Sequence, residues 1–523
     1  MQPGERLAVI DLGSNSFRLV VFMAGKGWWK RTDEIYEPVR IGEGLAASGR
    51  LGEKPMERAL ATLEVFAHFC RAAGLLDDRG SRRSQIGGSV DAVATSAIRD
   101  AENAADFLAR ARELIELPIR VLSREEEARY GYLAAVNSTT LTDGCVLDLG
   151  GGSLQLVGVA ERLARESGSW RLGTVRMSER FLPPNGPAKR KQMEELREHV
   201  ARELEQASWL AQTGRRLVGL GGTVRSLATA AQRAAGLPSN GVQGMVIERA
   251  ALDELVERLA ALPAAERSTI PGVKPARADL ILAGAIVVQG VLQAGGFDGL
   301  ETTEAGLREG VFFERLLAEH EEPLFEDLRR TSVMNLAARY NVDAAHTRHV
   351  AALALGMFDE LARLGLHGGD ARERELLWAA CMLHDIGMSV DYDDHHKHSR
   401  YLILNGGLPG FSPIEVATIA QAARYHRKGM PDPGPLAALF TDEDTERLNR
   451  CAVLLRLAED LERSRDQLVR GVDISLLNGK PDGDGAVELR VIAEGEAAVP
   501  RWAASRETEL FARAFHRDLS VAA

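Results

Sequence analysis

DLGSNS at residues 11–16 is the stretch that decides the fold, because a second version of it, DLGGGS at residues 148–153, occurs far along the chain. Each copy lies between two apolar runs, and this pattern predicts a strand, a tight turn and a second strand. Glycine in the turn lets backbone N–H groups come close to an anion, and the aspartate that ends each first strand offers oxygen ligands suited to Mg²⁺. We therefore expect the two turns to face each other across a cleft and to hold phosphate from both sides.

A third glycine turn, LGGT at residues 220–223, follows the apolar run 217–220 and precedes a helix-like stretch that begins at Val224. A glycine turn between a strand and a helix is a common anion site. One copy of the acidic-glycine pattern alone is equally compatible with an ordinary β-hairpin whose turn contains glycine. Two copies, each opened by aspartate and joined by this third turn, favour phosphate binding.

The chain has 523 residues, of which 45% are hydrophobic, so two to four domains with buried cores are expected. The longest apolar run, residues 281–292, is too short to span a membrane, so we expect a cytoplasmic protein with no membrane partner. The net charge of −11 argues against nucleic acid as a partner, but a local basic channel would still admit an anionic substrate. The cysteines are widely spaced in apolar contexts and are predicted to be buried thiols: Cys70, Cys145, Cys381 and Cys451.

Changes in pattern along the chain predict four domains. Residues 1–135 and 136–320 each alternate strand and helix signals and form two similar α/β lobes. Residues 324–470 are helical and rich in histidine, and residues 471–523 are expected to form a small α/β domain at the C-terminus.

A run of three glutamates at residues 125–127 follows the strand-like segment 118–122. Ser123 and these glutamates have the composition of a helix start, which explains the first two of them. Glu127 either belongs to the same first turn or points into the cleft, where a carboxylate could deprotonate water, and spacing alone does not choose between the two.

Arg99 follows the end of another strand-like segment. At that position the guanidinium could bind the charge of a phosphate. A surface salt bridge to Asp100 or Glu102 is the alternative interpretation.

Several motifs together resemble the exopolyphosphatase/guanosine pentaphosphate phosphohydrolase family. Besides the two acidic-glycine turns, they are ATSAIRDAEN at 94–103, SREEEAR at 123–129, GLGGT at 219–223 and GLREG at 306–310. Later stretches resemble the helical domain of the long members: LLWAACMLHDIG at 376–387, HHKHSRYLILN at 395–405 and ARYHRK at 423–428. The resemblance implies two actin/sugar-kinase/Hsp70-like (ribonuclease H-like) lobes, then an all-α HD-like domain and the small α/β domain.

The resemblance also implies an activity, namely Mg²⁺-dependent hydrolysis of the terminal phosphoanhydride of inorganic polyphosphate, with Mn²⁺ as another usable metal. Conversion of pppGpp to ppGpp is the alternative activity, and a non-catalytic sensor of polyphosphate or alarmone is the alternative without activity. A homodimer is implied by the resemblance alone.

By motif match, the resemblance assigns roles to individual residues. Glu127 takes the place of the catalytic glutamate, Asp148 that of the metal-associated aspartate and Arg99 that of the phosphate-contacting arginine. Asp11 is expected to hold the metal through water. The phosphate-loop roles fall on Ser14, Asn15, Gly151, Gly152, Ser153, Gly222 and Thr223.

Gln155 is a departure from the family pattern, which usually has glutamate two residues after the serine of the second turn. The amide oxygen of Gln155 can accept a hydrogen bond but carries no charge. We therefore expect Gln155 to be a weak metal contact at most, and this residue keeps the sensor alternative open.

The histidine-rich region resembles the HD superfamily of metal-dependent phosphohydrolases. Its expected ligands for a transition metal are His349, the pair His384 and Asp385, and Asp460. His396 and His426 are candidates for a second metal, together with His398. Imidazole and carboxylate together suit Mn²⁺, Fe²⁺ or Mg²⁺. Histidines that line a polyphosphate channel or cap helices are the alternative.

Overall fold

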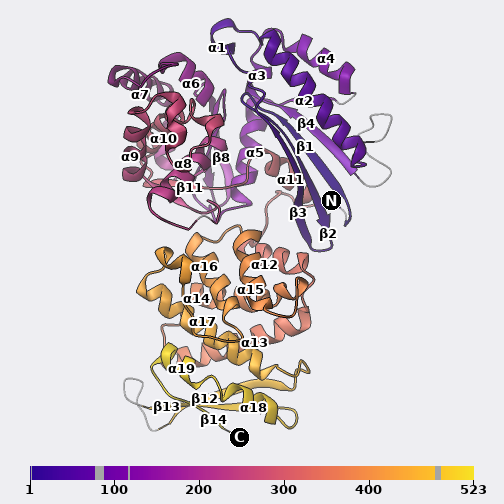
Figure 1. The fold of residues 1–523 in the computed structure, drawn as a ribbon, viewed down its shortest axis with the longest axis vertical. Coiled ribbons are helices and arrows are strands. Elements are labelled where there is room, and N and C mark those ends of the chain that lie inside the picture. The colour runs from indigo at the N-terminus through magenta and orange to yellow at the C-terminus, as the bar shows by residue number, and fades with distance from the viewer. Residues whose placement is uncertain (2, 77–87, 116–117, 239, 478–484, 523) are drawn as a thin grey trace. The chain divides into compact units, whose positions relative to one another are not determined.

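The computed structural model describes the chain except for residues 2, 77–87, 116–117, 239, 478–484 and 523 (Figure 1). The chain divides into two compact units, Met1–Leu328 and Arg329–Ala523. Each unit contains its own hydrophobic cores.

The first lobe of the first unit is built on a five-stranded sheet in the order β3-β2-β1-β4-β5. Its strands are β1 (Arg6–Leu12), β2 (Phe17–Gly25), β3 (Trp28–Glu37), β4 (Gly88–Ala94) and β5 (Ile119–Val121). The first three strands pair antiparallel, and β4 runs parallel to β1. Its helices are α1 (Leu45–Ser48), α2 (Glu53–Ala72), α3 (Ser96–Arg99) and α4 (Ala104–Ile115). Helices α2 and α4 cover one face of the sheet.

The second lobe repeats this plan on a six-stranded sheet in the order β10-β11-β9-β6-β7-β8. Its strands are β6 (Gly144–Leu149), β7 (Leu154–Ala160), β8 (Leu163–Trp170), β9 (Leu217–Leu220), β10 (Val246–Glu248) and β11 (Gly299–Thr302). Again three strands pair antiparallel, and β9 runs parallel to the first of them, β6. Its α-helices are α6 (Thr174–Phe181), α7 (Arg190–Leu204), α8 (Gly222–Ala234), α9 (Arg249–Ala260) and α10 (Ile281–Gly295), with short 3₁₀ helices at Ser208–Gln212, Ala264–Thr269 and Pro275–Arg277.

Two further helices, α5 (Arg124–Val136) and α11 (Leu307–Leu316), join the lobes by packing in the core between the two sheets. They cross so closely that a Cβ on Gly310 of α11 would overlap the carbonyl of Tyr130 on α5. Ser123 caps α5 in a capping box with Glu126, as its sequence predicts.

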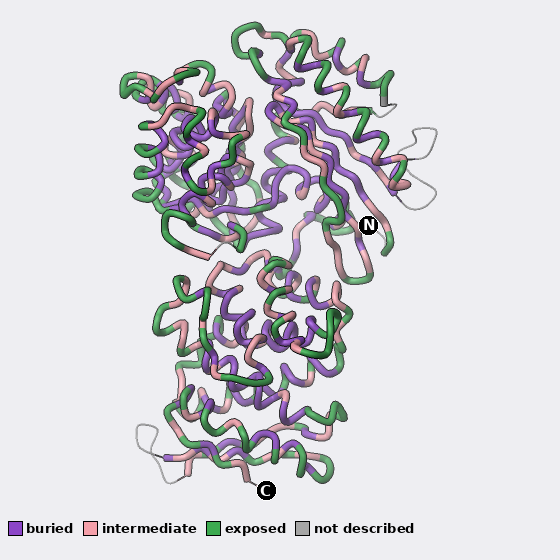
Figure 2. Tube along the Cα trace, in the orientation of Figure 1, coloured by how far each residue is buried: buried purple, intermediate pink, exposed green. Residues whose placement is uncertain are grey.

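Side-chain alternation explains why both aspartates face this shared core. On β1, Leu7 and Val9 pack into the core between the lobes, whereas Ala8 and Ile10 pack under α2 and α4. Alternate residues of a strand share one face, so Asp11, which comes next in this series, lies on the same face of β1 as Leu7 and Val9. Val146 of β6 belongs to the shared core as well, and Asp148, two residues later, lies on the same face of β6. The strands β1, β2, β4, β6, β7 and β9 and the helix α10 are buried along most of their length (Figure 2).

The second unit combines a helical bundle with a small sheet that share one core. Its α-helices are α12 (Leu328–Arg339), α13 (Ala344–Arg363), α14 (Ala371–Leu383), α15 (His395–Gly406), α16 (Pro413–Arg424), α17 (Asp442–Leu461), α18 (Ala498–Ala504) and α19 (Thr508–Phe515), with 3₁₀ helices at Ile386–Ser389 and Gly434–Leu439. The sheet has the order β12-β13-β14, formed by β12 (Val469–Leu477), β13 (Ala486–Ala493) and β14 (Leu519–Ala522).

All four cysteines are buried free thiols, as the sequence predicts. Within the described residues, no helix has both the length and the apolar character needed to cross a bilayer.

Candidate active site

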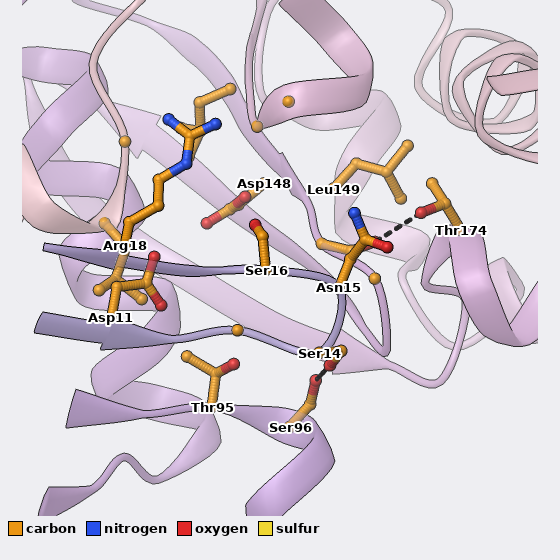
Figure 3. Close-up of a pocket in the computed structure, with 18 of the residues that line it drawn as sticks. Asp11, Ser14, Asn15, Ser16, Arg18, Thr95, Ser96, Asp148, Leu149 and Thr174 are labelled. Atoms are coloured by element: carbon orange, nitrogen blue, oxygen red, sulfur yellow. Dashed lines mark hydrogen bonds between the residues drawn. The ribbon is translucent and has the colours of Figure 1, made fainter. Parts of the chain in front are cut away.

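Both acidic-glycine turns line one pocket in the first unit (Figure 3). Residues 13–16 of the first turn, 149–151 of the second and 220–222 of the third contribute to its wall. The first two turns also touch: a Cβ on Gly152 would lie 2.9 Å from the Ser14 hydroxyl, and one on Gly151 would lie 3.1 Å from Ser14 Cβ. Ser14 Oγ and Ser96 Oγ are 3.2 Å apart and share a hydrogen bond. The structure therefore brings these turns from the two lobes together.

The backbone of both turns is arranged in the same way. Carbonyl oxygens of residues 14 and 15 accept hydrogen bonds from the segment after β3, and those of residues 150 and 151 accept them from the start of α6, which follows β8. Among the described residues, no acceptor is paired with the backbone N–H groups of Ser14, Asn15, Gly151 or Gly152. The side-chain amide nitrogen of Asn15 is also buried without a partner. These unpaired donors form the kind of surface that binds an anion.

Three carboxylates, those of Asp11, Glu127 and Asp148, line the same pocket. Burial raises the pKa of Asp148 to about 7, with further contributions from the negative charges of Glu127 and Asp11. Burial likewise raises the pKa of Glu127, although the charge of Arg99 opposes this change. Burial raises the pKa of Asp11 in spite of its 2.9 Å ion pair with Arg308.

The carboxylate of Asp148 has no hydrogen-bond or ion-pair partner within the described part of the chain. A partly buried carboxylate of this kind, close to two others, fits a hard divalent cation such as Mg²⁺.

Arg99 lies behind Glu127 and is not part of the pocket wall. Its guanidinium donates a 2.7 Å hydrogen bond to Glu127 and a 3.0 Å bond to the carbonyl of Leu122. A longer ion pair of 3.8 Å joins it to Asp100. Of the two interpretations made from the sequence, the ion pair with Asp100 is present, although it is longer than the contact by which Arg99 orients Glu127. Direct contact of Arg99 with phosphate stays a prediction.

Gln155 lies opposite Asp148 in the β6–β7 ladder and is buried behind the pocket wall. Its amide nitrogen donates to Ser153 Oγ over 2.7 Å, and Ser153 Oγ donates in turn to Glu127 over 3.4 Å. A glutamate at position 155 could not donate to Ser153 unless it were protonated. Gln155 therefore orients Ser153 toward Glu127, and it does not reach the pocket as a metal contact.

The remaining predicted loop residues divide into two groups. Ser14, Asn15, Gly151 and Gly222 line the pocket. Gly152, Ser153 and Thr223 support it from behind. A Cβ on Gly222 at the start of α8 would overlap the guanidinium of Arg277, so a larger residue there would displace that arginine from the pocket wall.

Four arginines of the pocket wall were not recognised from the sequence: Arg18, Arg225, Arg277 and Arg308. Burial, together with the nearby charge of Arg308, lowers the pKa of Arg225 to about 10. Burial and the charge of Arg308 also lower the pKa of Arg18. Cations held this close to one another favour an anion between them.

The arginines continue into an adjoining pocket, which Arg18, Arg225, Arg277 and Arg308 share with the first. Arg31 and Lys274 add positive charge to its wall, and Glu34, Glu304 and Glu309 add negative charge. Its one aromatic residue, Tyr36, is covered by the guanidinium of Arg18, 4.7 Å from the ring centre.

In the second unit, the structure brings together a set of residues that differs from the predicted metal ligands. His384, Asp385 and His426 lie together, joined by His346 and His395. His349 instead contacts the carbonyl of Val469 and the carboxylate of Glu462. Asp460 pairs with Arg463, and His396 lies 3.8 Å from Asp394. His346 and Glu459 occupy the places predicted for His349 and Asp460.

The fold has two α/β lobes built on the same plan, and the pocket between their turns has the groups that a phosphatase needs. The model of the Ppx/GppA phosphatase family matches residues 25–319, and the model of Ppx/GppA phosphatase domain III matches residues 328–491. The chain therefore belongs to the Ppx/GppA phosphatase family, and the resemblance seen in its motifs is confirmed.

Solved structures agree with this membership. A Ppx/GppA family member from Aquifex aeolicus is 29% identical and superposes with a TM-score of 0.51, covering 61% of this chain and 99% of that chain. An exopolyphosphatase from Cytophaga hutchinsonii has a TM-score of 0.54, covers 60% of this chain and 98% of that chain, and at 21% identity supports the fold alone. The expected α/β fold class with a helical C-terminal region is confirmed. The HD-like character of that region stays a prediction.

Proposed function

We propose that this protein is an exopolyphosphatase that hydrolyses the terminal phosphoanhydride bond of inorganic polyphosphate and releases orthophosphate. One observation carries the proposal: a single pocket contains both acidic-glycine turns, three carboxylates and four arginines. Phosphoryl transfer requires positive groups around the phosphate and a group that orients or deprotonates water, and this pocket has both.

In the proposed reaction, water attacks the terminal phosphorus in line with the bridging oxygen. The new bond forms between the water oxygen and phosphorus, the bond to the bridging oxygen breaks, and the shortened chain keeps that oxygen with its electron pair. Glu127 accepts the proton of the attacking water. Burial raises the pKa of Glu127 toward the range in which a carboxylate is an effective base near neutral pH. Arg99 holds the Glu127 carboxylate in position, and its positive charge favours the ionised form of that carboxylate.

The arginines and the unpaired N–H groups of the turns bind the non-bridging oxygens of the terminal phosphate. Arg18 comes from β2 of the first lobe and Arg225 from α8 of the second, so the phosphate would be bound from both lobes. Asp148 would hold Mg²⁺ directly and Asp11 through water, since Asp11 already pairs with Arg308. The ion, or Mn²⁺ in its place, neutralises charge on the phosphoryl group.

Hydrolysis of pppGpp is the second candidate. The adjoining pocket favours polyphosphate, because its wall carries Arg31 and Lys274 and its one aromatic ring is covered by Arg18. A run of further phosphates would meet positive charge there, whereas a guanine base would need an uncovered stacking surface.

Specificity constants decide between these functions. We expect kcat/KM to rise with polyphosphate chain length and to exceed the value for pppGpp, in assays with Mg²⁺ and with Mn²⁺. A higher kcat/KM for pppGpp would favour the second candidate. Tight binding of polyphosphate without turnover under either metal would favour a non-catalytic sensor.

Lys274→Ala tests the role of the adjoining pocket. We expect this variant to raise KM for long polyphosphate by several-fold and to leave tripolyphosphate hydrolysis unchanged, because the short substrate does not extend that far. Lys189→Ala, a change outside both pockets, is the matched control. An equal effect of Lys274→Ala on both substrates would contradict the proposed path of the chain.

A further inference from the structure

The second unit contains two groups of buried ligand atoms that share one carboxylate. His346, His384 and Asp385 form one group, and Asp385, His395 and His426 form the other. Within each group the candidate ligand atoms lie within 4.8 Å of one another. All five residues are buried. Such a pair of sites is the arrangement in which one carboxylate bridges two metal ions.

Hydrogen bonds fix the orientation of three of these imidazoles. The Nδ1 atoms of His384, His395 and His426 each lie 2.7–2.8 Å from the carbonyl three residues earlier in the chain. Each Nδ1–H donates to that carbonyl, which leaves the lone pair on Nε2. Arg427 also approaches Nδ1 of His395, but at 3.4 Å this is the longer contact. The three rings are therefore held in the tautomer that binds a metal through Nε2.

The Nε2 atoms of His395 and His426 lie 3.1 Å apart. With both protons on Nδ1, neither Nε2 has a hydrogen to donate, so two lone pairs face each other. Two nitrogens bound to one metal at about 2.1 Å lie about 3 Å apart, so a cation removes this conflict.

The other group also contains buried ligand atoms without a hydrogen-bond partner among the described residues. Nε2 of His384 and Oδ1 of Asp385 are buried, and neither makes a hydrogen bond to any described residue. Glu459 lies 3.2 Å from that nitrogen and 3.0 Å from Nε2 of His346. The second carboxylate oxygen of Asp385 is held by Arg465 at 2.7 Å. His346 and His384 thus lie beside carboxylates, and imidazoles and carboxylates together are ligands suited to a divalent transition metal.

A cavity of about 720 Å³ opens onto this cluster, which is enough for a small phosphorylated molecule. His395, His426 and Glu459 form part of its wall. The basic residues of the wall are Arg427, Lys428, Arg463, Arg465 and Arg506. The wall also carries Asp393, Asp394, Asp460 and Glu507, and three of these carboxylates are paired, Asp394 with Lys397, Asp460 with Arg463 and Glu507 with Arg456. Arg427 and Arg506 have no ion-pair partner among the described residues, so they supply positive charge beside the cluster.

We propose that the second unit binds two divalent transition-metal ions, with Asp385 as the bridging ligand. His346 and His384 hold one ion, His395 and His426 hold the other, and Glu459 supports the first. The ions and the basic wall bind the phosphate group of a ligand. This site is separate from the anhydride-hydrolysing pocket of the first unit and does not depend on the function proposed for it.

Cobalt binding to the full-length protein tests the metal centre. After the protein is stripped of metal with a chelator, it is titrated with Co²⁺ and read by metal analysis and by visible d–d absorption. We expect the wild type to bind about two more Co²⁺ ions per chain than Asp385→Asn. Comparison with this variant cancels any Co²⁺ bound in the first unit. Equal binding and equal spectra for the two proteins would overturn the proposal.

Two matched pairs of variants locate the ligands. His395→Ala and His346→Ala are each expected to lose about one ion, whereas His396→Ala and His349→Ala are expected to keep both. The members of each pair lie on one helix, so damage to folding would affect them similarly, and circular dichroism checks this. Loss of metal from the His396→Ala and His349→Ala proteins instead would overturn the ligand assignment.

Inorganic phosphate tests the ligand class. Added to the cobalt-loaded protein, it is expected to shift the d–d absorption, with a several-fold weaker apparent affinity in Arg427→Ala. The same measurement on Asp385→Asn isolates the second unit, because Co²⁺ held in the first unit contributes equally to both proteins. An unchanged spectrum at saturating phosphate would overturn the phosphate part of the proposal.

Discussion

Asp148 lies at the end of β6 as a partly buried carboxylate with two negative neighbours, Asp11 and Glu127. Its pKa is raised from 3.8 to about 7 in the metal-free protein. A raised folded-state pKa means that the folded protein holds a proton that the unfolded chain has lost, so stability falls as pH rises from about 4 to about 7. A divalent cation would restore this lost stability, because it stabilises the ionised carboxylate of Asp148.

We therefore expect metal-free protein to have a lower Tm at pH 8 than at pH 6, and Mg²⁺ to raise the Tm at pH 8. In Asp148→Asn both effects should shrink, and Asp33→Asn on the exposed surface of β3 should leave them intact. Thermal unfolding at both pH values, with and without Mg²⁺, measures this. The same response to Mg²⁺ in Asp148→Asn and wild type would exclude Asp148 as a ligand.

Arg99 acts on the reaction through Glu127. Removal of its positive charge raises the pKa of Glu127, so more of that carboxylate is protonated at a given pH. We expect Arg99→Ala to lower kcat by about 10-fold or more and to move the acid limb of the kcat–pH profile to higher pH. Arg99→Lys should restore part of the shift. An unmoved acid limb with a raised KM would indicate that Arg99 binds phosphate directly.

Individual site residues were predictable where a local pattern marks them. Asp11, Asp148 and the glycines belong to repeated turns whose chemistry is readable from sequence. Arg308 lies within the motif GLREG, and Arg225 follows GLGGT by two residues, so a motif signal existed for both. Arg277 had no such signal, because its convergence with the others depends on tertiary packing.

Neighbouring positions on one helix caused the errors in the second unit. His346 and His349 are three residues apart on α13, and His395 and His396 are adjacent on α15. Helical periodicity assigns a residue to a face of the helix but does not set the rotation of that helix against its neighbours. Only the packed structure shows which imidazole reaches the cluster.

At the level of elements, the second acidic-glycine turn depends on the start of α6. The N–H groups of Thr174 and Val175 donate to the carbonyls of Gly150 and Gly151 at 3.0 and 2.9 Å. Gly173 precedes them, and a Cβ there would overlap the backbone of the turn. The turn and the helix therefore hold each other in place.

Gly173→Ala is expected to destabilise the protein by about 1–3 kcal/mol, because the turn has to move to accommodate the methyl group. Gly150→Ala is the matched control in the same turn, since a Cβ there would lie 3.4 Å from the Ser153 carbonyl oxygen. Urea unfolding of both variants measures the difference. Equal stability of the two would mean that the turn is not held rigidly by α6.

Both hairpins, the strand-to-helix turn after β9 and the capped start of α5 were predicted from sequence, because apolar alternation and turn residues act locally. The close crossing of α5 and α11 was not predicted. It rests on Gly310 and Tyr130, which are far apart in the chain, and a single glycine within a helix carries no information about its partner.

At the level of the whole molecule, a net charge of −11 coexists with a pocket lined by four arginines. The substrate therefore approaches a negative protein and binds at a local positive site. Salt screens the attraction between the pocket and a polyanion, and the effect grows with the number of charges that interact.

We expect KM for long polyphosphate to rise several-fold between low and physiological ionic strength, with little change in kcat. Tripolyphosphate should show a smaller rise, because fewer of its charges meet the pocket walls. Initial rates at varied potassium chloride concentration measure both. A KM that is independent of salt would contradict an electrostatic binding site.

The central claim is that the turns of the two lobes form one hydrolytic site in which Glu127 activates water. Orthophosphate release by Glu127→Gln tests it most directly, with polyphosphate binding measured in parallel by calorimetry and Glu125→Gln, an exposed glutamate of the same helical turn, as the control. The account predicts that release falls by about 10²–10⁴-fold while affinity for polyphosphate is kept, and that the control retains full activity. Undiminished orthophosphate release by Glu127→Gln would contradict the account.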